Sequence, residues 1–356
     1  MVVTGMNAAA EDIRILVAGC GSIGRRHARI LRSLGVNHLW VCDPSAQQRE
    51  GLLTLTPSER VFPTYAAGLE ARPDAVFICT PPRLHIPMAI EALQSGAHVF
   101  CEKPLTDSTD GLDTLRQTVA DSGRQFMVGF CFRYHEGLKL ARRMLDEGRI
   151  GRLISIRSRM GEHLPTVRPD YKTLFTTQYS GAFDLTHEVD LACWFAQGLP
   201  VVNVASLYGK FSDVEMRAPD LVELLVQFGD SCLASVHLDF FSQPRSRVTE
   251  LAGTEGTISV EFSSWDLCTI RVCTAGESVW KTQTLETDRD DMFRSEDAEF
   301  LAAIAGAGCV GVDLTEACRS LEILRAAHEG TLSPLFPRHH LSRGVRDGRA
   351  PVPAAL

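Results

Sequence analysis

Residues 13–35 read IRILVAGCGSIGRRHARILRSLG, which places a short apolar run, a glycine-rich turn and a helical repeat in immediate succession. The apolar run from Ile13 to Ala18 has the length of a buried strand in a parallel sheet. The spacing Gly19-x-Gly21-x-x-Gly24 follows it, and apolar residues then recur at helical intervals. A strand that runs through GxGxxG into a helix predicts the first βαβ unit of a dinucleotide-binding fold.

The glycine-rich turn predicts where a pyrophosphate would bind. Glycines let the backbone approach the phosphates closely, and the helix N-terminus offers free N–H groups and the positive end of a dipole. Arg25 and Arg26 in the first helical turn oppose that dipole, so they fit either a nearby anion or two solvated side chains. The residues expected to contact the cofactor in this turn are Gly19, Gly21, Ser22, Ile23 and Gly24.

A second apolar run, HLWVC, ends at Asp43, which lies 19 residues after Gly24. An acid about 20 residues past the glycine motif binds the ribose 2′-OH in NAD enzymes. Asp43 therefore favours NAD as the cofactor, with NADP as the alternative. A helix N-cap followed by Pro44 would explain the same acid on structural grounds, and the two roles are compatible.

Strand and helix patterns alternate up to residue 129. This rhythm predicts a doubly wound parallel sheet covered by helices, in which ligands bind outside the carboxyl ends of the strands. Thr80 and Pro81 follow one apolar strand, and Glu102, Lys103 and Pro104 follow the next without a loop between. We therefore expect Lys103 on the cofactor side of the sheet rather than in a surface turn. The expected strands are 13–18, 38–42, 74–79, 97–101 and 125–129.

From residue 150 the pattern changes to a series of short strands, several with alternating apolar residues, and two helical patterns at 184–197 and 313–329. One face of such a sheet has to be covered by helices or by a partner, which predicts a homodimer or homotetramer formed through this sheet. The expected strands are 152–161, 201–209, 220–228, 232–241, 246–253, 256–263 and 267–274.

The chain is therefore expected to divide into four parts. A disordered leader, 1–11, precedes a dinucleotide-binding domain at 12–129. A substrate and oligomerisation domain follows at 130–330, and its last helix is expected to pack back on the first domain. Residues 331–356 are rich in proline and arginine and are expected to form a loosely held tail.

Composition excludes several classes of function. A formal net charge of −8 without a Lys/Arg run argues against nucleic-acid binding. No apolar stretch reaches the roughly 18–20 residues of a membrane span, and the leader lacks a signal-peptide pattern. Eleven cysteines without a CxxC pair are typical of a reduced cytoplasm. The histidines show no zinc-ligand spacing with these cysteines, so we expect no metal site.

Six segments taken together resemble the Gfo/Idh/MocA family of oxidoreductases, the group of glucose–fructose oxidoreductase and inositol dehydrogenase. They are GCGSIGRRH (19–27), ICTPPRLH (78–85), ALQSGAHVFCEKPL (92–105), GFCFRYHEGL (129–138), IGRLISIR (150–157) and GAFDLTHEVDLACW (181–194). The resemblance implies a Rossmann domain followed by an α+β domain with a large, mostly antiparallel sheet. It also implies reversible hydride transfer between NAD, or NADP, and a sugar, sugar derivative, cyclitol or related polyol.

The resemblance also implies contacts with the cofactor from the strand ends. The Glu-Lys-Pro segment would lie beside the nicotinamide, with a Lys–Pro bond that is often cis. The implied cofactor contacts outside the glycine turn and Asp43 are Thr80, Pro81, His85, Glu102 and Lys103.

Oxidation of a secondary alcohol needs a base for the hydroxyl proton as the hydride leaves carbon. Lys103 and His187 are the candidates, and a helix N-terminus at His187 favours the neutral imidazole. The resembling branch carries an acid four residues before the histidine, whereas here Asp184 lies three before it and Asp190 three after. Asp184 is expected to be catalytic and also fits a helix N-cap. Which of the two acids is the partner of His187 stays open.

Substrate contacts are expected from a polar loop at 162–180, because loops on a rigid scaffold carry specificity. Arg168 in this loop has two alternative roles: a bidentate contact with a carboxylate or phosphate of the substrate, or an exposed side chain that binds nothing. The expected substrate contacts are Lys103, Arg133, Arg168, Tyr171, Tyr179 and His187.

Two other functions compete with a dehydrogenase of sugars or cyclitols. One is a non-catalytic sensor of sugars or dinucleotides with the same fold, which the presence of both Lys103 and His187 disfavours. The other is a diol dehydrogenase with a non-sugar substrate, which the polar loop disfavours.

Overall fold

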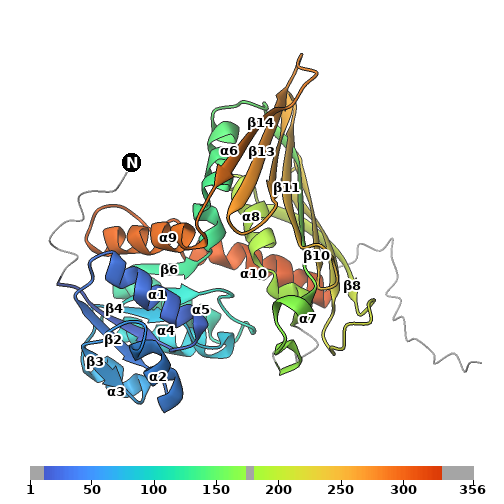
Figure 1. The fold of residues 1–356 in the computed structure, drawn as a ribbon. Coiled ribbons are helices and arrows are strands. Elements are labelled where there is room, and N and C mark those ends of the chain that lie inside the picture. Colours follow the sequence, from blue (N-terminus) through green and yellow to red (C-terminus); the bar gives the residue numbers. More distant parts are fainter. Residues whose placement is uncertain (1–11, 174–179, 331–356) are drawn as a thin grey trace, which may run out of the picture.

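A six-stranded parallel sheet forms the first half of the chain (Figure 1). The computed structural model describes residues 12–173 and 180–330, so the expected leader, the tail and Tyr179 lie outside the described residues. The strand order is β3-β2-β1-β4-β5-β6, with every neighbouring pair parallel. This order confirms the doubly wound sheet. The strands are β1 Arg14–Ala18, β2 His38–Cys42, β3 Arg60–Phe62, β4 Ala75–Ile78, β5 His98–Glu102 and β6 Phe126–Gly129.

Helices connect successive strands, as parallel pairing requires. Local sequence sets their ends: the hydroxyl oxygens of Ser45 and Thr64 accept backbone N–H groups at the starts of two helices. Gly123, with a φ of +62°, ends another. The helices are α1 Ser22–Ser33, α2 Ala46–Leu53, α3 Tyr65–Glu70, α4 His85–Gln94 and α5 Leu112–Ser122, with a short 3-10 turn, η2 Pro82–Leu84.

The second half of the chain forms an eight-stranded sheet with the order β14-β13-β12-β11-β7-β10-β9-β8. All neighbours are antiparallel except β7 and β10, which run parallel. The large, mostly antiparallel sheet is therefore confirmed. Its strands are β7 Leu153–Gly161, β8 Val201–Gly209, β9 Leu221–Phe228, β10 Cys232–Asp239, β11 Ser246–Gly253, β12 Gly256–Phe262, β13 Leu267–Thr274 and β14 Lys281–Glu286.

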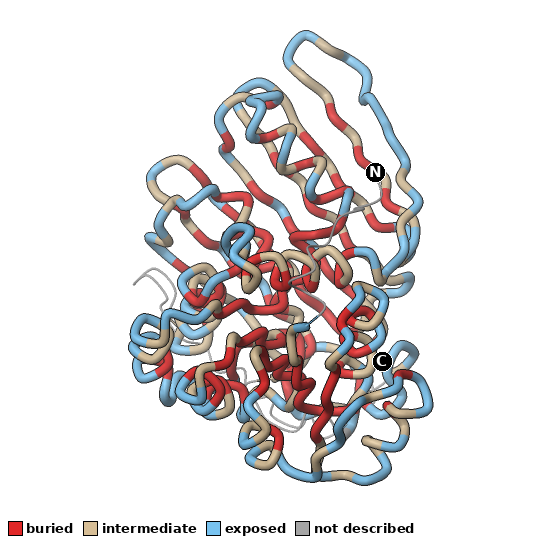
Figure 2. Tube along the Cα trace, turned by 90° about the vertical axis from the view of Figure 1, so that its left-hand side faces the viewer, coloured by how far each residue is buried: buried red, intermediate tan, exposed pale blue. Residues whose placement is uncertain are grey.

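Within the part of the chain that the structure describes, helices cover one face of this sheet and leave the other open. The covering helices are α6 Glu136–Asp146, α8 His187–Phe195 and α10 Leu314–Glu329. Figure 2 shows the resulting concentration of buried residues in the strands and in the segments between the two sheets. On the open face, Leu207, Leu225 and Leu233 are exposed at 68%, 49% and 49%. The shorter elements of this half are η3 Cys131–Tyr134, α7 Leu164–Val167, η4 Tyr171–Thr173 and η5 Gly181–Asp184.

The last two helices tie the second half of the chain to the first. Helix α9, Arg289–Ile304, packs against α1 of the first domain and against η3. Helix α10 contacts both β6 and β8, one strand from each sheet. Figure 1 shows α9 and α10, in orange and red, lying between the two sheets.

The structure corrects two details of the sequence interpretation. Helix α8 begins at His187 rather than near Asp184, because residues 181–184 form the separate 3-10 turn η5. Asp184 is therefore not the N-cap; Thr186 occupies that position, without a side-chain cap hydrogen bond. Among the described residues, no helix combines the length and apolar character that crossing a membrane requires.

Candidate active site

The glycine-rich turn between β1 and α1 leaves room for a ligand at one glycine and none at the other two. A Cβ on Gly19, whose φ is +99°, would lie 2.6 Å from the Cys79 carbonyl oxygen, and one on Gly24 would lie 1.9 Å from the Gly19 carbonyl oxygen. A Cβ on Gly21 would meet no described atom within 4 Å, and no side chain caps α1 there. The open side of Gly21, with the first N–H groups of α1, therefore fits a pyrophosphate.

Both arginines of the first turn of α1 have partners within the described chain. Arg25 donates to the Cys20 carbonyl oxygen (2.9 Å) and to Gln48 (2.8 Å). Arg26 forms an ion pair with Asp290 (3.1 Å) at the start of α9. These contacts attach the turn to its neighbours.

Asp43 lies at the carboxyl end of β2, directly beside the glycine-rich turn. Its Oδ2 accepts the N–H of Cys20 (2.9 Å), and its Oδ1 accepts the N–H of Ser45 (2.8 Å). The two bonds fix the carboxylate where the ribose of a dinucleotide is expected. They also give Asp43 a role in the turn, so the two roles inferred from the sequence coexist.

The strand ends that follow β4 and β5 are joined by one buried side chain. The His85 ring lies between the carbonyl oxygen of Thr80 (2.7 Å from Nε2) and that of Pro104 (2.9 Å from Nδ1). Burial lowers the pKa of His85, although the hydrogen bonds to the two carbonyl oxygens oppose that shift. His85, expected from the resemblance to contact the cofactor, thus holds the Thr80-Pro81 turn against the Glu-Lys-Pro turn.

Lys103 follows β5 directly, and the Lys103–Pro104 peptide is cis. Its backbone N–H donates to Oε2 of Glu102 (3.0 Å). The Lys103 ammonium acts electrostatically on both Asp184 and His187. The fold therefore brings together the three groups that the sequence interpretation named as catalytic, although one lies on the first domain and two on the second.

His187 is the first residue of α8 and is surrounded by aromatic rings. Its ring centroid lies 4.8 Å from that of Phe132 and 5.9 Å from that of Phe130. Burial holds the pKa of His187 well below its usual value, and the positive charges of Lys103 and Arg247 act in the same direction. The imidazole is therefore neutral at physiological pH and able to accept a proton.

Asp184 ends η5, two residues before the N-cap of α8. Burial raises the pKa of its carboxyl group to about 6, although the nearby Lys103 ammonium opposes that rise. A carboxyl group with such a pKa changes charge within the range in which enzymes work.

Asp190 is bound elsewhere and is not a partner of His187. Arg133 donates to both of its carboxylate oxygens, at 2.9 and 2.7 Å, and also reaches Glu316 at 3.4 Å. Arg133 and Asp190 are both buried. Through Asp190 and Glu316, Arg133 joins η3, α8 and α10, which gives it an internal role; its contact with the substrate stays a prediction. Of the two acids, Asp184 is the one that shares with His187 the electrostatic influence of the Lys103 ammonium.

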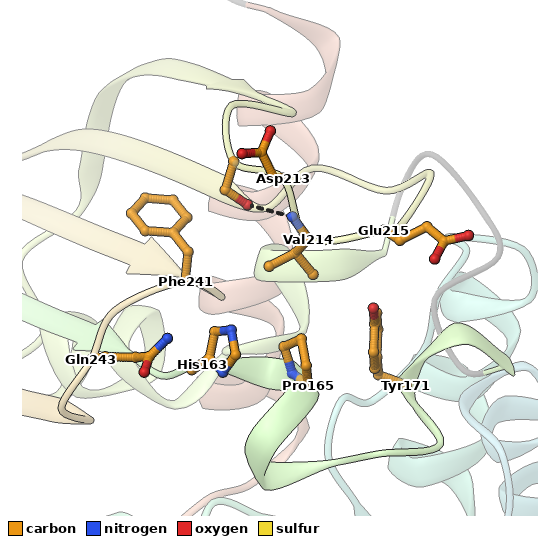
Figure 3. Close-up of a pocket in the computed structure, with 9 residues that line it drawn as sticks. His163, Pro165, Tyr171, Asp213, Val214, Glu215, Phe241 and Gln243 are labelled. Atoms are coloured by element: carbon orange, nitrogen blue, oxygen red, sulfur yellow. Dashed lines mark hydrogen bonds between the residues drawn. The ribbon is translucent and has the colours of Figure 1, made fainter.

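Residues 163–171, in the described part of the loop at 162–180, border a cavity of about 440 Å³. Tyr171 is buried at its edge, and Figure 3 shows Pro165 and Tyr171 on one side with Val214 and Glu215 on the other. Arg168 is exposed and lies 3.9 Å from Asp170. Tyr179 lies outside the described residues. The cavity is lined by His163, Pro165, Tyr171, Ser212, Asp213, Val214, Glu215, Phe241 and Gln243.

The sequence interpretation missed a buried ion pair next to His187. Arg247 on β11 and Glu188 on α8 are 2.7 Å apart, with side chains exposed at only 4% and 1%. The Arg247 guanidinium lies 3.6 Å from the centre of the Phe132 ring. The alternation of β11 was the available signal, because it places position 247 on the covered face.

Two further arginines lie beside this ion pair. Arg245 and Arg289 lie over the Trp265 ring at 3.9 and 4.0 Å, and Arg245 also pairs with Glu162 at 3.2 Å. Nothing in the sequence linked Arg289, 44 residues further along the chain, to Arg245. Within residues 12–173 and 180–330, no group of three or more His, Cys, Asp or Glu side chains has the arrangement of a metal site.

Two family models match this chain. Residues 13–130 match the model described as "Oxidoreductase family, NAD-binding Rossmann fold", and residues 138–259 match the "GFO/IDH/MocA C-terminal domain". The chain belongs to the Gfo/Idh/MocA family of oxidoreductases. Its first domain is therefore an NAD-binding Rossmann domain, as the glycine-rich turn predicted.

Known members of the family resemble this chain at moderate identity. An inositol 2-dehydrogenase of Leifsonia xyli subsp. xyli is 29% identical over 235 residues, 64% of this chain and 66% of the relative. A 2,7-anhydro-N-acetylneuraminate hydratase of Mediterraneibacter gnavus is 27% identical over 268 residues, 71% of this chain and 68% of the relative. The match thus spans about two thirds of the length of these curated relatives.

Solved structures share the fold over most of the chain. A levoglucosan dehydrogenase in complex with NADH and levoglucosan superimposes with a TM-score of 0.78 at 20% identity, covering 89% of this chain and 96% of the other. The myo-inositol 2-dehydrogenase of Lactobacillus plantarum gives 0.76 at 22% identity, with the same coverage.

Proposed function

We propose that the protein is an NAD(P)-dependent oxidoreductase that transfers a hydride between the nicotinamide and a CH–OH carbon of a sugar, sugar derivative or cyclitol. The observation that carries this proposal is that the Lys103 ammonium, at the carboxyl end of β5, acts electrostatically on both His187 and Asp184. The relatives that are inositol and levoglucosan dehydrogenases support the substrate class. The open glycine-rich turn and Asp43 would hold the cofactor, with NAD favoured over NADP.

Bound NAD⁺ would accept the hydride, with both electrons of the C–H bond. The residues of this chain manage the proton that the hydroxyl group loses. The Lys103 ammonium hydrogen-bonds the reacting oxygen and stabilises its developing negative charge. The neutral His187 imidazole accepts the proton, and the Asp184 carboxylate stabilises the imidazolium that forms. In the reverse direction the same groups return the proton to the carbonyl oxygen.

Kinetics of two variants test this assignment. The assay follows NADH at 340 nm with a panel of sugars and cyclitols. Losing one general acid–base group typically costs about 10²–10⁴-fold in rate, so Lys103→Met and His187→Ala should each lose that much kcat while NADH still binds. Lys139→Met, an exposed lysine on α6, is the matched control and should keep full activity. Wild-type kcat in Lys103→Met would contradict the mechanism, and sugar binding without any turnover would favour the sensor.

The substrate would extend from Lys103 and His187 toward Arg168 and Tyr171, because Tyr171 lines a cavity and Arg168 is exposed in the same loop. We also propose a cytoplasmic homodimer or homotetramer. The described cysteines are all free, and apolar side chains stand exposed on the open face of the second sheet. Light scattering of the wild type and of Leu225→Lys tests the assembly: the variant should have the lower mass.

A further inference from the structure

The fully buried imidazole of His27 lies between two carboxylates, one of which belongs to Glu102, the residue before Lys103. Nδ1 of His27 lies 2.8 Å from Oδ1 of Asp297, and Nε2 lies 2.9 Å from Oε1 of Glu102. The three residues come from α1, α9 and β5. The rings of Phe77, Phe100 and Phe293, with centroids 5.1 to 5.7 Å from that of His27, surround the imidazole. None of the steps proposed above uses this cluster.

The geometry dictates the protonation of His27. Each ring nitrogen faces a carboxylate oxygen, so both bonds exist together with ionised carboxylates only if both nitrogens carry a proton. Burial opposes the charge, but the two carboxylates, Asp297 first, outweigh it and raise the pKa of His27 to about 10. The other ionisable groups near the cluster are Glu296, Arg294, Cys79, Cys101, Cys131, His85 and Lys103.

Glu102 connects the buried His27 imidazole to the backbone of Lys103 in the proposed active site. One of its carboxylate oxygens receives the His27 bond, and the other accepts the backbone N–H of Lys103 at 3.0 Å. We propose that His27 is a positioning residue, which clamps Glu102 to Asp297 and so fixes the backbone from which the Lys103 side chain reaches the substrate. This inference rests on the proposed function of Lys103.

Asp297→Asn tests the clamp because it keeps the size of the side chain and removes one charge. The amide of the substituted side chain can accept from Nδ1–H or donate to a bare Nδ1, so the tautomer of a neutral His27 is no longer fixed and the Glu102 bond is kept in only one of the two arrangements. Because the larger of the two attractions is lost, the pKa of His27 falls. The clamp then opens at a pH at which the wild type still holds it.

The variant should lose activity on the basic side of the pH profile. In the wild type, deprotonation of His27 should lower kcat only near pH 10. In Asp297→Asn the fall in kcat should begin at least about one pH unit lower. Above that point kcat should fall about 10–100-fold, the scale of a misplacement of about 1 Å, with KM for NADH unchanged. Glu296→Gln is the matched control. Burial keeps the Glu296 carboxyl protonated on the same helix, so its profile should match the wild type.

Hydrogen exchange of the Lys103 amide gives a readout that needs no substrate. At pH 9 the exchange should be at least about tenfold faster in Asp297→Asn than in Glu296→Gln, because the Glu102 acceptor has moved. If Asp297→Asn fails to fold, His27→Gln replaces it. Its amide can donate to only one of the two carboxylates, and kcat should fall about 10–100-fold at every pH.

Wild-type kcat in His27→Gln, or an unshifted basic limb with an unchanged Lys103 amide in Asp297→Asn, would overturn the inference. The proposed function fails in a different way. If the wild-type protein oxidises no member of the panel, the mechanism is wrong, and the exchange of the Lys103 amide still decides whether His27 positions that backbone.

Discussion

Removing Arg247 should destabilise the protein strongly, because it leaves a buried carboxylate without its counter-charge. Glu188 is 1% exposed and lies 2.7 Å from Arg247. Breaking a buried ion pair from one side costs about 3–5 kcal/mol. Arg247→Met keeps the apolar stem against Phe132, so we expect a loss of about 4 kcal/mol, roughly a thousandfold in the unfolding equilibrium. In Arg247→Met with Glu188→Gln the buried charge is gone, and most of the stability should return.

The dependence on pH identifies the cause of this loss. Burial already raises the pKa of Glu188 above 4.5, and Arg247 opposes that rise. A carboxyl group whose folded pKa is raised destabilises the fold as pH rises above its unfolded value. The loss in Arg247→Met should therefore be small up to the folded pKa of Glu188 in the wild type, which lies above 4.5, and grow by up to about 1.4 kcal/mol per pH unit above it. Urea unfolding at pH 5 and pH 8 measures the difference. An equal loss at both pH values, or no recovery in the double variant, would refute the electrostatic reasoning and point to packing.

Four other substitutions test the cofactor and proton sites. Gly24→Ala places a methyl group 1.9 Å from the Gly19 carbonyl oxygen, so its melting temperature should fall, whereas Gly21→Ala should melt normally yet bind NADH more weakly in a fluorescence titration. Asp43→Ala should weaken NAD more than NADP, because the carboxylate repels only the 2′-phosphate; an unchanged preference would leave Asp43 as a turn residue. Asp184, with a pKa of about 6, should give activity an acidic limb near that pH. Asp184→Asn should lack this limb and should gain more stability at pH 8 than at pH 4, where the native acid is protonated.

Five of the six strands of the first sheet and the cofactor turn were predictable because their causes are local; the three-residue strand β3 was missed. An apolar run of five or six residues between turn signals leaves few alternatives in a sheet covered on both faces. Lys103 could be placed for the same reason, since the end of a parallel strand is also the ligand edge of the sheet. In the second sheet, alternation along each strand was enough to find β7 to β13. Strand β14 was missed because all but one of its residues are exposed and no alternation marks it.

The sites that depend on distant segments were not predictable. Helix α9 is packed on two sides, against α1 and η3, so its apolar residues form no single stripe. Its buried acids, Glu296 and Asp297, have the appearance of surface residues in the sequence. Arg133 was expected at the substrate because nothing local indicated that Asp190 would bind it. A single sequence does not show which buried charges pair with each other when the residues are far apart along the chain.

The contact between His27 and Asp297 of α9 also determines when His27 acquires its final charge during synthesis. The last strand of the first sheet ends at Gly129, whereas Asp297 is made 168 residues later (297 − 129). At about 5–20 residues per second, the ribosome adds Asp297 about 10–30 s after that strand. During this interval His27 has Glu102 but not Asp297 as a carboxylate partner, so its Nδ1 lacks the bond that it makes in the complete fold. The domain that emerges first is therefore among the last parts of the chain to reach its final charge.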